Sequence, residues 1–344
     1  MRFYLITNKD EKTENKVMNM KTKKILRIVA AIIIAILVVG GGIWLITGRS
    51  PMAIIVKSAM HQMDTESYDK AMADKTDKSK IEIPAGVVFP REVVQYTIGD
   101  MQVFEVPAEN DTKPVVLYLH GGAYVHNFTS QHWKAMAEWA KTTGCGIVAP
   151  NYPLLPLHTA AEAHPLMMQL YRKLLDGTPA SRILIMGDSA GGGFTLALAQ
   201  QIRNDSLDLP RHLVLISPWV DVMGGDPSIQ ERDNWLTIEV LQKYGTAWAG
   251  EMGVDNPIIS PLYGDMAGLP PTDLFTGTWE VFYTDVCKTY DKMKTAGVDA
   301  RLHVAEKMGH VYPLWPSPEG RKARREIAEI IKMNSKKIKD YEQD

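Results

Sequence analysis

The chain has 344 residues, with 38 Lys or Arg against 40 Asp or Glu and a formal net charge of −2. This balance lacks the strong positive charge that binding to a polyanion needs, so we expect no nucleic-acid partner. Of the two cysteines, Cys145 lies in an apolar strand pattern and Cys287 in a helix pattern, and no Cys/His cluster has metal-ligand spacing. We therefore expect two buried free thiols and no zinc or redox site.

The N-terminal part predicts a membrane segment. Residues 1–24 are polar and rich in lysine, and no charged residue occurs from Ile28 to Ile46. A helix of this length spans about 28 Å at ~1.5 Å per residue, close to the thickness of a bilayer core. The run has no polar face, exceeds a typical signal-peptide core and lacks an Ala-x-Ala cleavage site. Residues 25–47 are therefore predicted to be an uncleaved signal anchor, with secretion after cleavage as the alternative.

The lysines cluster before this span and thin out after it. The positive-inside rule then predicts a cytoplasmic N-terminus and a catalytic domain outside the cytoplasm. Residues 48–84 are predicted to be a linker that includes a candidate N-terminal cap helix, since apolar residues recur at helical spacing between Pro51 and Met63.

Residues 85–334 alternate strand and helix patterns, which predicts an α/β fold with a mostly parallel sheet, followed by a polar tail at 335–344. The expected strands are 93–98, 101–106, 114–119, 146–150, 183–186, 211–219, 274–279 and 300–305, and the expected helices are 132–141, 160–176, 194–200, 237–251 and 319–332. The pattern breaks at about 220–269, where we expect an inserted cap.

A Gly-x-Ser-x-Gly sequence, Gly187 to Gly191, follows one of these apolar strands and precedes a helix of small residues. Strand, sharp turn and helix are the context of a nucleophile elbow. Such a turn would hold Ser189 above the N-terminus of the next helix, where backbone N–H groups favour developing negative charge. The alternative is a glycine-rich turn with an incidental serine.

A glycine pair, Gly121 and Gly122, follows the expected central strand 114–119. Glycines at the carboxyl end of such a strand allow backbone N–H groups to face a crevice. An acyl-transfer site needs these donors for the oxyanion of its tetrahedral intermediate. We assign the N–H groups of Gly121, Gly122 and Ala190 to this role, and expect His120 to brace the loop.

A serine nucleophile needs a histidine base and a carboxylate that orients it, in the chain order Ser, acid, His. His310 follows the last strand in a loop and is the candidate base, whereas His303 lies within that strand. Glu280 follows the strand 274–279 and is the candidate acid. Asp285 is the alternative, and Asp273 lies at the wrong end of its strand.

These paired motifs resemble the hormone-sensitive-lipase-like family of α/β-hydrolases. The resemblance covers about residues 85–332 and rests on His120-Gly121-Gly122-Ala123-Tyr124, Asn151-Tyr152-Pro153-Leu154, Gly187-Asp188-Ser189-Ala190-Gly191-Gly192, Ser217-Pro218-Trp219-Val220-Asp221 and Gly309-His310-Val311-Tyr312. It implies a carboxylesterase or lipase with a two-part cap. Carried over, it makes Ser189, Glu280 and His310 the triad, with the oxyanion donors assigned above.

The sequence departs from the family pattern at four positions. Ala123 replaces the third glycine of the oxyanion motif, and Glu280 replaces the commoner aspartate. Asn151 and Pro153 stand where the family usually has aspartate and arginine. A supporting ion pair is therefore expected to be missing.

The expected activity is hydrolysis of carboxylic esters with short to medium acyl chains through an acyl-enzyme on Ser189, which needs no cofactor or metal. The expected partners are a small-molecule ester and, through residues 25–47, the lipid bilayer. An amidase, deacetylase or peptidase would use the same triad. A membrane-tethered binding protein on an inactive hydrolase fold is the remaining alternative.

Overall fold

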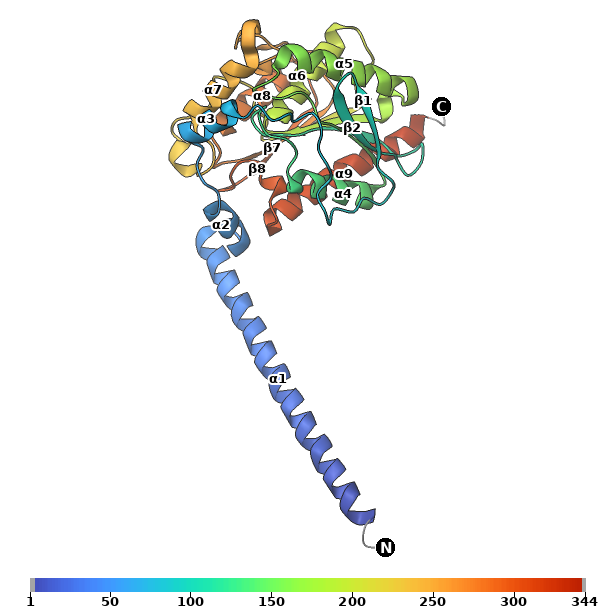
Figure 1. Ribbon diagram of the computed structural model, residues 1–344, viewed down its shortest axis with the longest axis vertical. Coiled ribbons are helices and arrows are strands. Elements are labelled where there is room, and N and C mark those ends of the chain that lie inside the picture. Colours follow the sequence, from blue (N-terminus) through green and yellow to red (C-terminus); the bar gives the residue numbers. More distant parts are fainter. Residues whose placement is uncertain (1–3, 342–344) are drawn as a thin grey trace. The chain divides into compact units, whose positions relative to one another are not determined.

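Figure 1 shows the computed structural model, which describes the backbone of residues 4–341 and the side chains of residues 22, 25–26, 28–35 and 37–335. The basic character predicted for 1–24 and the polar character predicted for 335–344 concern side chains that lie almost entirely outside this range. The chain divides into two units, one ending at Pro51 and the other beginning at Met52.

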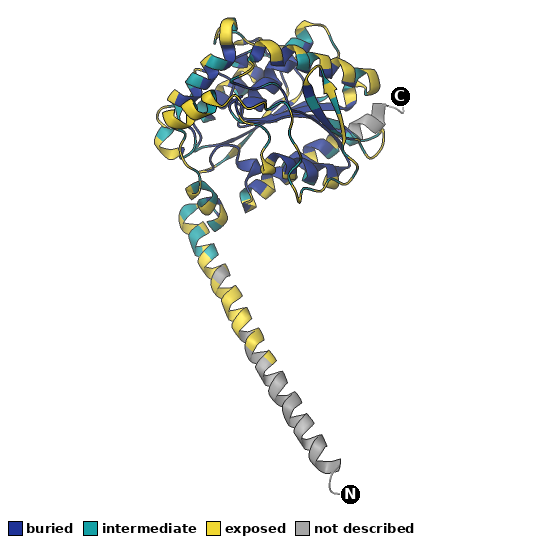
Figure 2. Ribbon diagram, in the orientation of Figure 1, coloured by how far each residue is buried: buried dark blue, intermediate teal, exposed yellow. Residues whose placement is uncertain are grey.

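The first unit contains the helix α1 (Tyr4–Thr47). Its segment Ile28–Thr47 is the one described helix long and apolar enough to cross a membrane, with a hydropathy of 2.8. Its apolar side chains are exposed, as Figure 2 shows in yellow, and Leu37 and Val38 are examples. A membrane span and an N-terminal signal sequence both have these properties.

The second unit is built on an eight-stranded sheet with the order β1-β2-β4-β3-β5-β6-β7-β8. The β1–β2 hairpin is antiparallel, β2 also pairs antiparallel with β4, and all other neighbours are parallel. The strands are β1 (Val94–Ile98), β2 (Met101–Val106), β3 (Val115–Leu119), β4 (Gly146–Pro150), β5 (Ile183–Asp188), β6 (His212–Ile216), β7 (Thr272–Gly277) and β8 (Ala300–Ala305). The predicted α/β fold with a mostly parallel sheet is thus confirmed.

Helices cover both faces of this sheet (Figure 1). One face carries α4 (Ser130–Thr143) and α9 (Pro318–Tyr341), and the other carries α5 (Ala160–Gly177), α6 (Ala190–Asn204) and α8 (Tyr283–Thr295). Because both faces are covered, the central strands are buried and continuously apolar, as is usual for parallel sheets. Figure 2 shows this core in dark blue.

The segment between β6 and β7 corresponds to the region where a cap is predicted, and we refer to it as the cap. It contains α7 (Ile238–Ala249) and the short helices η2 (Gln230–Arg232), η3 (Gly250–Met252) and η4 (Pro261–Tyr263). The preceding N-terminal segment contributes α2 (Pro51–Ser58) and α3 (Thr65–Ala73), and Tyr68 of α3 packs on Tyr244 of α7 with ring centroids 4.8 Å apart. From Met52 onward, the region expected to be a linker therefore belongs to the second unit.

Several boundaries differ from the sequence prediction. The helix α2 ends at Ser58 although the apolar spacing continues to Met63, and α9 continues to Tyr341, into the region assigned as a tail. Both cysteines are free, but Cys287 is only half-buried, so its predicted burial is wrong in part. Burial raises the pKa of the Cys145 thiol to about 11.

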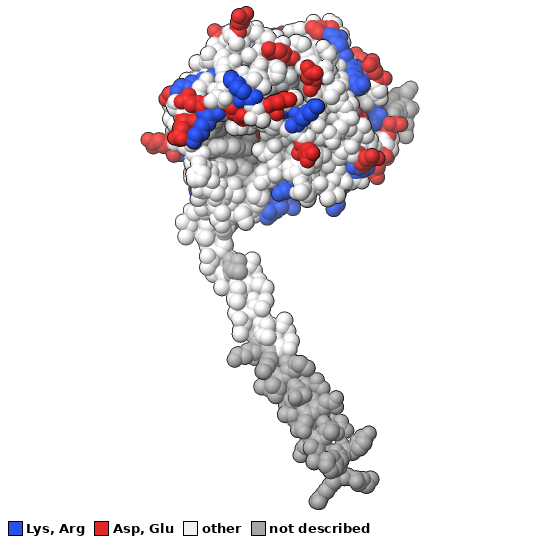
Figure 3. All heavy atoms as spheres, viewed as in Figure 1, with Lys and Arg blue, Asp and Glu red and all other residues white. Residues whose placement is uncertain are grey.

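On the face drawn in Figure 3, basic and acidic side chains of the second unit are interspersed rather than gathered by sign. This distribution agrees with the near balance of 38 basic and 40 acidic residues. The face shown therefore has no extended basic surface of the kind that binds nucleic acid.

Candidate active site

Ser189 lies in the sharp turn between β5 and α6. Its backbone has φ 53° and ψ −122°, a conformation that costs about 1–3 kcal/mol and is typical of functional turns. The Ser189 N–H donates to the Ile216 carbonyl at 2.8 Å, which ties the turn to β6. A Cβ at Gly187 would lie 2.2 Å from the Gly191 carbonyl oxygen, and one at Gly191 would lie 2.1 Å from that of Leu119. The turn therefore requires both glycines.

The structure brings together the three residues assigned as a triad. The Ser189 Oγ lies 2.8 Å from the His310 Nε2, and the His310 Nδ1 lies 2.7 Å from the Glu280 Oε2. Since a carboxylate only accepts hydrogen bonds, the Nδ1 carries the proton and the Nε2 accepts from the serine hydroxyl. The geometry therefore suits Ser189 to the role of nucleophile, His310 to that of base and Glu280 to that of orienting acid.

Glu280 is completely buried just after β7. Its second oxygen, Oε1, accepts from the Thr276 hydroxyl and, at 3.0 Å, from the Gly277 N–H. These donors satisfy the carboxylate oxygen that does not face the histidine. The strand β7 ends at Gly277, two residues earlier than expected, and the Gly277 N–H donates to Glu280 instead of to a neighbouring strand.

The loop that carries His310 is held from two sides. The Val311 N–H donates to the Ser217 hydroxyl at 3.0 Å, and the Trp315 indole donates to the His310 carbonyl at 3.0 Å. Phe282 and Trp235 contact the imidazole edge to face, with ring centroids 5.2 and 5.6 Å away. These contacts fix the position of the ring.

The alternative acid, Asp285, does not contact the histidine. It lies in the first turn of α8, where its Oδ2 accepts from the Gly225 N–H at 2.8 Å and its Oδ1 pairs with the Lys288 ammonium at 2.9 Å. Its role is structural, since it fixes the start of α8 against the cap. Of the two carboxylates considered, only Glu280 contacts His310.

Asp273 and His303, which the sequence analysis did not assign to the triad, belong to a separate cluster with His212. Asp273 lies between the imidazoles of His212 and His303, at 2.7 and 2.6 Å. Burial opposes ionisation of Asp273, but hydrogen bonds and charge interactions with the two histidines outweigh it and hold its pKa below the ordinary value. Among the described residues, no group of three or more His, Cys, Asp or Glu side chains could hold a metal ion.

The oxyanion assignment needs one correction. The Gly121 N–H donates to the buried Asp188 Oδ1 at 3.1 Å, so it is directed away from the position of an oxyanion donor. No hydrogen bond occupies the N–H groups of Gly122, Ala123 or Ala190 within the described part of the chain. Gly122 and Ala123 have φ angles of 124° and 52°, which turn this loop sharply. The two consecutive N–H groups that remain available are those of Gly122 and Ala123.

His120 braces this loop, as expected from its place before the glycines. Its Nδ1 donates to the Gly121 carbonyl at 2.7 Å, and its ring stacks on Tyr152 at 4.4 Å. Burial, followed by the neighbouring His132, lowers the pKa of His120 to about 3. A neutral ring at ordinary pH agrees with the predicted role of His120 in bracing the loop.

Asp188, next to the nucleophile, is the centre of a buried network that the sequence did not reveal. Its Oδ1 also accepts from the Tyr118 hydroxyl at 2.7 Å, and its Oδ2 lies 3.2 Å from the His132 Nε2. Burial disfavours the charge, but His132, Tyr118 and the Gly121 N–H outweigh it and hold the pKa of Asp188 below its ordinary value. The network links β3, α4 and the oxyanion loop behind Ser189.

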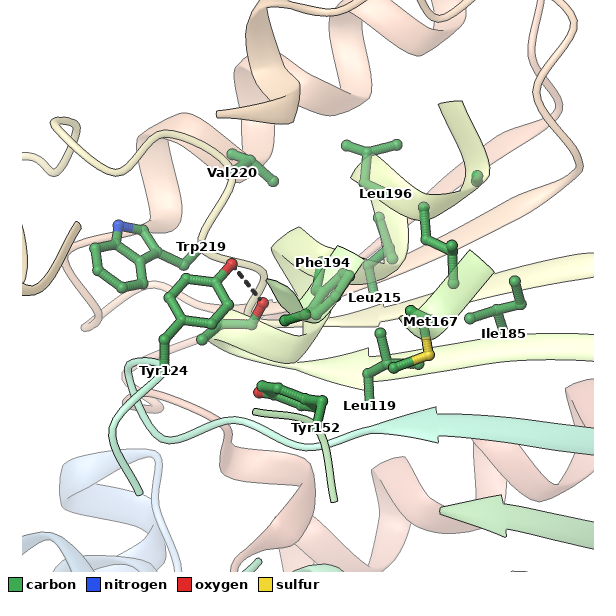
Figure 4. Close-up of a cluster of buried hydrophobic side chains, with 14 of the residues drawn as sticks. Leu119, Tyr124, Tyr152, Met167, Ile185, Phe194, Leu196, Leu215, Trp219 and Val220 are labelled. Carbon is green, nitrogen blue, oxygen red and sulfur yellow. Dashed lines mark hydrogen bonds between the residues drawn. The ribbon is translucent and has the colours of Figure 1, made fainter. Parts of the chain in front are cut away.

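Aromatic rings line the region beside the nucleophile. Figure 4 shows Tyr124 donating to the Ala190 carbonyl, at 3.0 Å, with Trp219 beside it. The Trp219 ring stacks between Tyr124 at 5.7 Å and Phe282 at 5.9 Å, and the Trp219 backbone N–H donates to the Ser189 carbonyl at 2.9 Å. The surroundings of the serine are therefore largely apolar.

The N-terminal segment holds the cap loop that carries Trp235. The Met63 N–H donates to the Trp235 carbonyl at 2.8 Å, and the Thr237 hydroxyl donates to the Met63 carbonyl. Asn234 donates to the Lys57 carbonyl at 3.0 Å. Residues 57–63 thus support the loop whose indole contacts His310.

A serine at a strand-to-helix turn, hydrogen-bonded to a histidine at the carboxyl edge of a mostly parallel sheet, defines the architecture of the α/β hydrolases. A family model described as alpha/beta hydrolase fold matches residues 116–314, more than half of the chain. The chain belongs to this family, among its hormone-sensitive-lipase-like esterases and lipases.

Relatives with similar sequences are named as lipases, esterases and acetyl-hydrolases. The chain is 34% identical over 189 residues to a triacylglycerol lipase of Mycobacterium tuberculosis, covering 54% of this chain but only 39% of that protein. It is 30% identical over 226 residues to an acetyl-hydrolase of Streptomyces hygroscopicus, covering 63% of this chain and 74% of the relative. These relatives group the chain with carboxylesterase- and lipase-like enzymes, which hydrolyse carboxylic esters.

Solved structures agree with this assignment. An esterase from the bacterial hormone-sensitive lipase family has a TM-score of 0.69 and 27% identity, over 82% of this chain and 96% of that one. The match extends well beyond the region of the family model, so the predicted family resemblance is confirmed.

Proposed function

We propose that the protein hydrolyses carboxylic esters through an acyl-enzyme on Ser189. The observation that carries this proposal is the continuous hydrogen-bonded chain from the Ser189 Oγ through His310 to Glu280. A serine hydroxyl is a weak nucleophile unless a base removes its proton, and the His310 Nε2 is within reach to do so.

In the proposed reaction, the Ser189 Oγ attacks the ester carbonyl carbon while the His310 Nε2 takes the hydroxyl proton. The imidazolium then gives this proton to the alkoxy oxygen, and the alcohol leaves as the acyl-enzyme forms. Water next attacks the acyl carbon and loses its proton to His310, which returns it to Ser189 as the acid leaves. Glu280 keeps the His310 Nδ1 protonated throughout and stabilises the imidazolium.

The negative charge on the carbonyl oxygen needs hydrogen-bond donors during both attacks. We propose the N–H groups of Gly122, Ala123 and Ala190, since Gly121 is occupied by Asp188. One such donor contributes about 3–4 kcal/mol to the transition state. The strained backbone of the loop presents these groups without reorganisation.

We further propose that the acyl group is short to medium in length. Trp219 and Phe282 are both buried beside the serine and the histidine, and both are rigid rings. A relative is named an acetyl-hydrolase, which agrees with a short acyl group. A long chain would have to displace this stacked pair, at the cost of its packing.

Replacing the nucleophile tests the proposal. Ser189→Ala is expected to lower kcat for p-nitrophenyl acetate by at least about 10⁴-fold, because the attacking oxygen is lost. Ser228→Ala, at an exposed position of the cap, is the matched control and should keep wild-type activity. Circular dichroism establishes that both variants fold. Wild-type turnover by a folded Ser189→Ala variant would refute the mechanism.

We also propose that residues 25–47 anchor the protein in a membrane, with the catalytic unit outside the cytoplasm. The hydropathy of Ile28–Thr47 and the lysines that precede it support this arrangement. Uncleaved anchoring is favoured because the apolar run is long and no Ala-x-Ala site follows it.

A further inference from the structure

The short helix α2 has apolar side chains on two sides. Its inner face packs into the hydrophobic core of the second unit through Ala53, Val56 and Met60. On the other side, Met52 is 43% exposed and Ile55 is 60% exposed. Ala59 is also exposed, and it lies on this side because its N–H donates to the Ile55 carbonyl at 3.0 Å, which continues the helical spacing. We refer to Met52, Ile55 and Ala59 as the outer face of α2.

The outer face carries no charge. Among the eight residues of α2, all of which the structure describes, only Lys57 is charged. Its ammonium lies over the Trp279 ring, 4.2 Å from the centroid, and donates to the Arg232 carbonyl, so it is engaged with the catalytic unit. An uncharged apolar helix face suits a hydrophobic environment better than water.

The connection of the chain indicates which hydrophobic environment lies next to this face. The segment Ile28–Thr47 is long and apolar enough to cross a membrane, and only residues 48–50 join it to Pro51, where α2 begins. These four residue steps extend over at most about 14 Å. If the segment spans a bilayer, α2 therefore begins within that distance of the point where the span ends.

We propose that the outer face of α2 inserts into the membrane surface and docks the catalytic unit on the lipid bilayer. The proposal rests on the membrane anchor proposed above. Interfacial helices bury their apolar face about 5–10 Å into the boundary between headgroups and acyl chains. Three apolar side chains alone bind lipid weakly, but the anchor keeps α2 at the surface, and this high effective concentration makes a weak contact sufficient.

Docking through α2 would hold the active-site loops next to the membrane. Lys57, in the last turn of α2, contacts Trp279, the residue before the proposed acid. The Asn234 amide donates to the Lys57 carbonyl at 3.0 Å. The next residue, Trp235, contacts the His310 ring. Since α2 is only about 12 Å long, the loops that carry the proposed acid and the cap indole would lie close to the bilayer surface.

The test uses the full-length chain in phosphatidylcholine vesicles, with a fluorescent maleimide on a single introduced cysteine. Cys287→Ser removes the half-buried thiol, and Cys145 is buried. A second set of vesicles contains a lipid with a nitroxide near the headgroup end of its acyl chain, which quenches labels that enter the bilayer. Labels on Ile55→Cys and on Met52→Cys should each lose at least about half of their fluorescence. Circular dichroism establishes that the labelled variants fold.

Two further labels serve as controls. Leu157→Cys, at a 44% exposed position beside α5, should keep its fluorescence, because α5 lies on the far side of the second unit from α2 (Figure 1). Leu37→Cys, at a 67% exposed position of α1, should be quenched and reports the anchor itself. The readout needs no turnover, so its result is independent of the proposed hydrolysis.

Each other outcome overturns the proposal. Quenching of the Leu37 label without quenching on the outer face would leave the anchor in place and refute docking, and a second copy of the chain or another protein on this face would give that result. An unquenched Leu37 label would refute the anchor and docking together. Equal quenching of the Leu157 label would show that the outer face is not the surface in contact with lipid.

Discussion

At the scale of single residues, the proposed acid, Glu280, distinguishes this site from the commoner pattern with aspartate. Glu280 reaches the His310 Nδ1 at 2.7 Å, while its other oxygen is held by Thr276 and Gly277. The longer side chain is accommodated because the strand ends at Gly277, so the carboxylate turns back over the strand end. The orienting role depends on where the oxygens lie rather than on stem length.

This assignment predicts different effects for the two carboxylates. Glu280→Gln should lower kcat by about 10³–10⁴-fold, because an amide no longer selects the required tautomer of His310. Asp285→Asn is the matched control and should change kcat by less than about tenfold, since Asp285 contacts Gly225 and Lys288 instead. Steady-state hydrolysis of p-nitrophenyl acetate measures both. The opposite ranking would contradict the assignment of the acid.

Ser189, Glu280 and His310 could be predicted as a triad from the sequence because each follows a strand. The carboxyl ends of parallel strands meet at one edge of the sheet, which brings the three residues together. The sequence did not predict that the Gly121 N–H donates to Asp188, because a motif identifies a flexible backbone but not the direction of each N–H group. It also gave no sign of the Asp188 network, whose partners Tyr118 and His132 lie on two other elements. Such contacts depend on tertiary packing.

At the scale of elements, the contact between α5 and α6 makes the fold sensitive to acid. His164 of α5 is buried, stacks on Phe194 at 4.0 Å and accepts from Gln201 at 2.7 Å. Burial lowers the pKa of His164 to about 3. In the unfolded chain a histidine has a pKa of about 6.5, so below that pH the unfolded state binds a proton that the folded state excludes. Stability is therefore lost as the pH falls from about 6.5 towards 3.

The free energy of unfolding should accordingly fall between pH 7.5 and pH 5.0, with about 2 kcal/mol of the loss due to His164. His164→Gln removes this titration and should reduce the loss by about that amount, whatever its effect on stability at pH 7.5. His61→Gln, at an exposed position, is the control and should behave like the wild type. Urea unfolding at the two pH values measures the effect. An unchanged pH dependence in His164→Gln would contradict it.

Periodicity predicted the order and type of the strands and helices in the catalytic unit, because buried strands and amphipathic helices have distinct patterns. Boundaries set by tertiary contacts were missed. The apolar spacing after Ser58 does not continue the helix, because this segment pairs with the cap loop through Met63 and Trp235. The end of β7 at Gly277, whose N–H donates to the Glu280 carboxylate, was also missed.

At the scale of the whole molecule, an apolar helix precedes a self-contained catalytic unit. If residues 25–47 anchor the chain, the full-length protein should sediment with membranes and be released by detergent but not by salt. A chain that begins at Met52 should be soluble and should keep its esterase activity within about twofold, because the sheet, cap and triad all lie after that residue. Recovery of the full-length protein in the soluble fraction would contradict anchoring.

The orientation of this anchor is tested separately. Protease added to intact cells should degrade the catalytic unit and leave a short N-terminal fragment, because the lysine-rich flank is expected to remain in the cytoplasm. A catalytic unit that is protected until the cells are opened would contradict this orientation. Mass spectrometry of the mature N-terminus distinguishes an anchored chain from one secreted after cleavage.

The central claim is that Ser189 is a nucleophile activated by His310. Its most direct test is the reaction of the full-length protein with a fluorophosphonate, followed by mass spectrometry of the intact chain and of its peptides. We predict a single adduct on Ser189, no adduct in Ser189→Ala, and labelling at least about 10³-fold slower in His310→Ala, which lacks the base. A wild-type chain that stays unlabelled, or an adduct on another residue, would contradict the proposed mechanism.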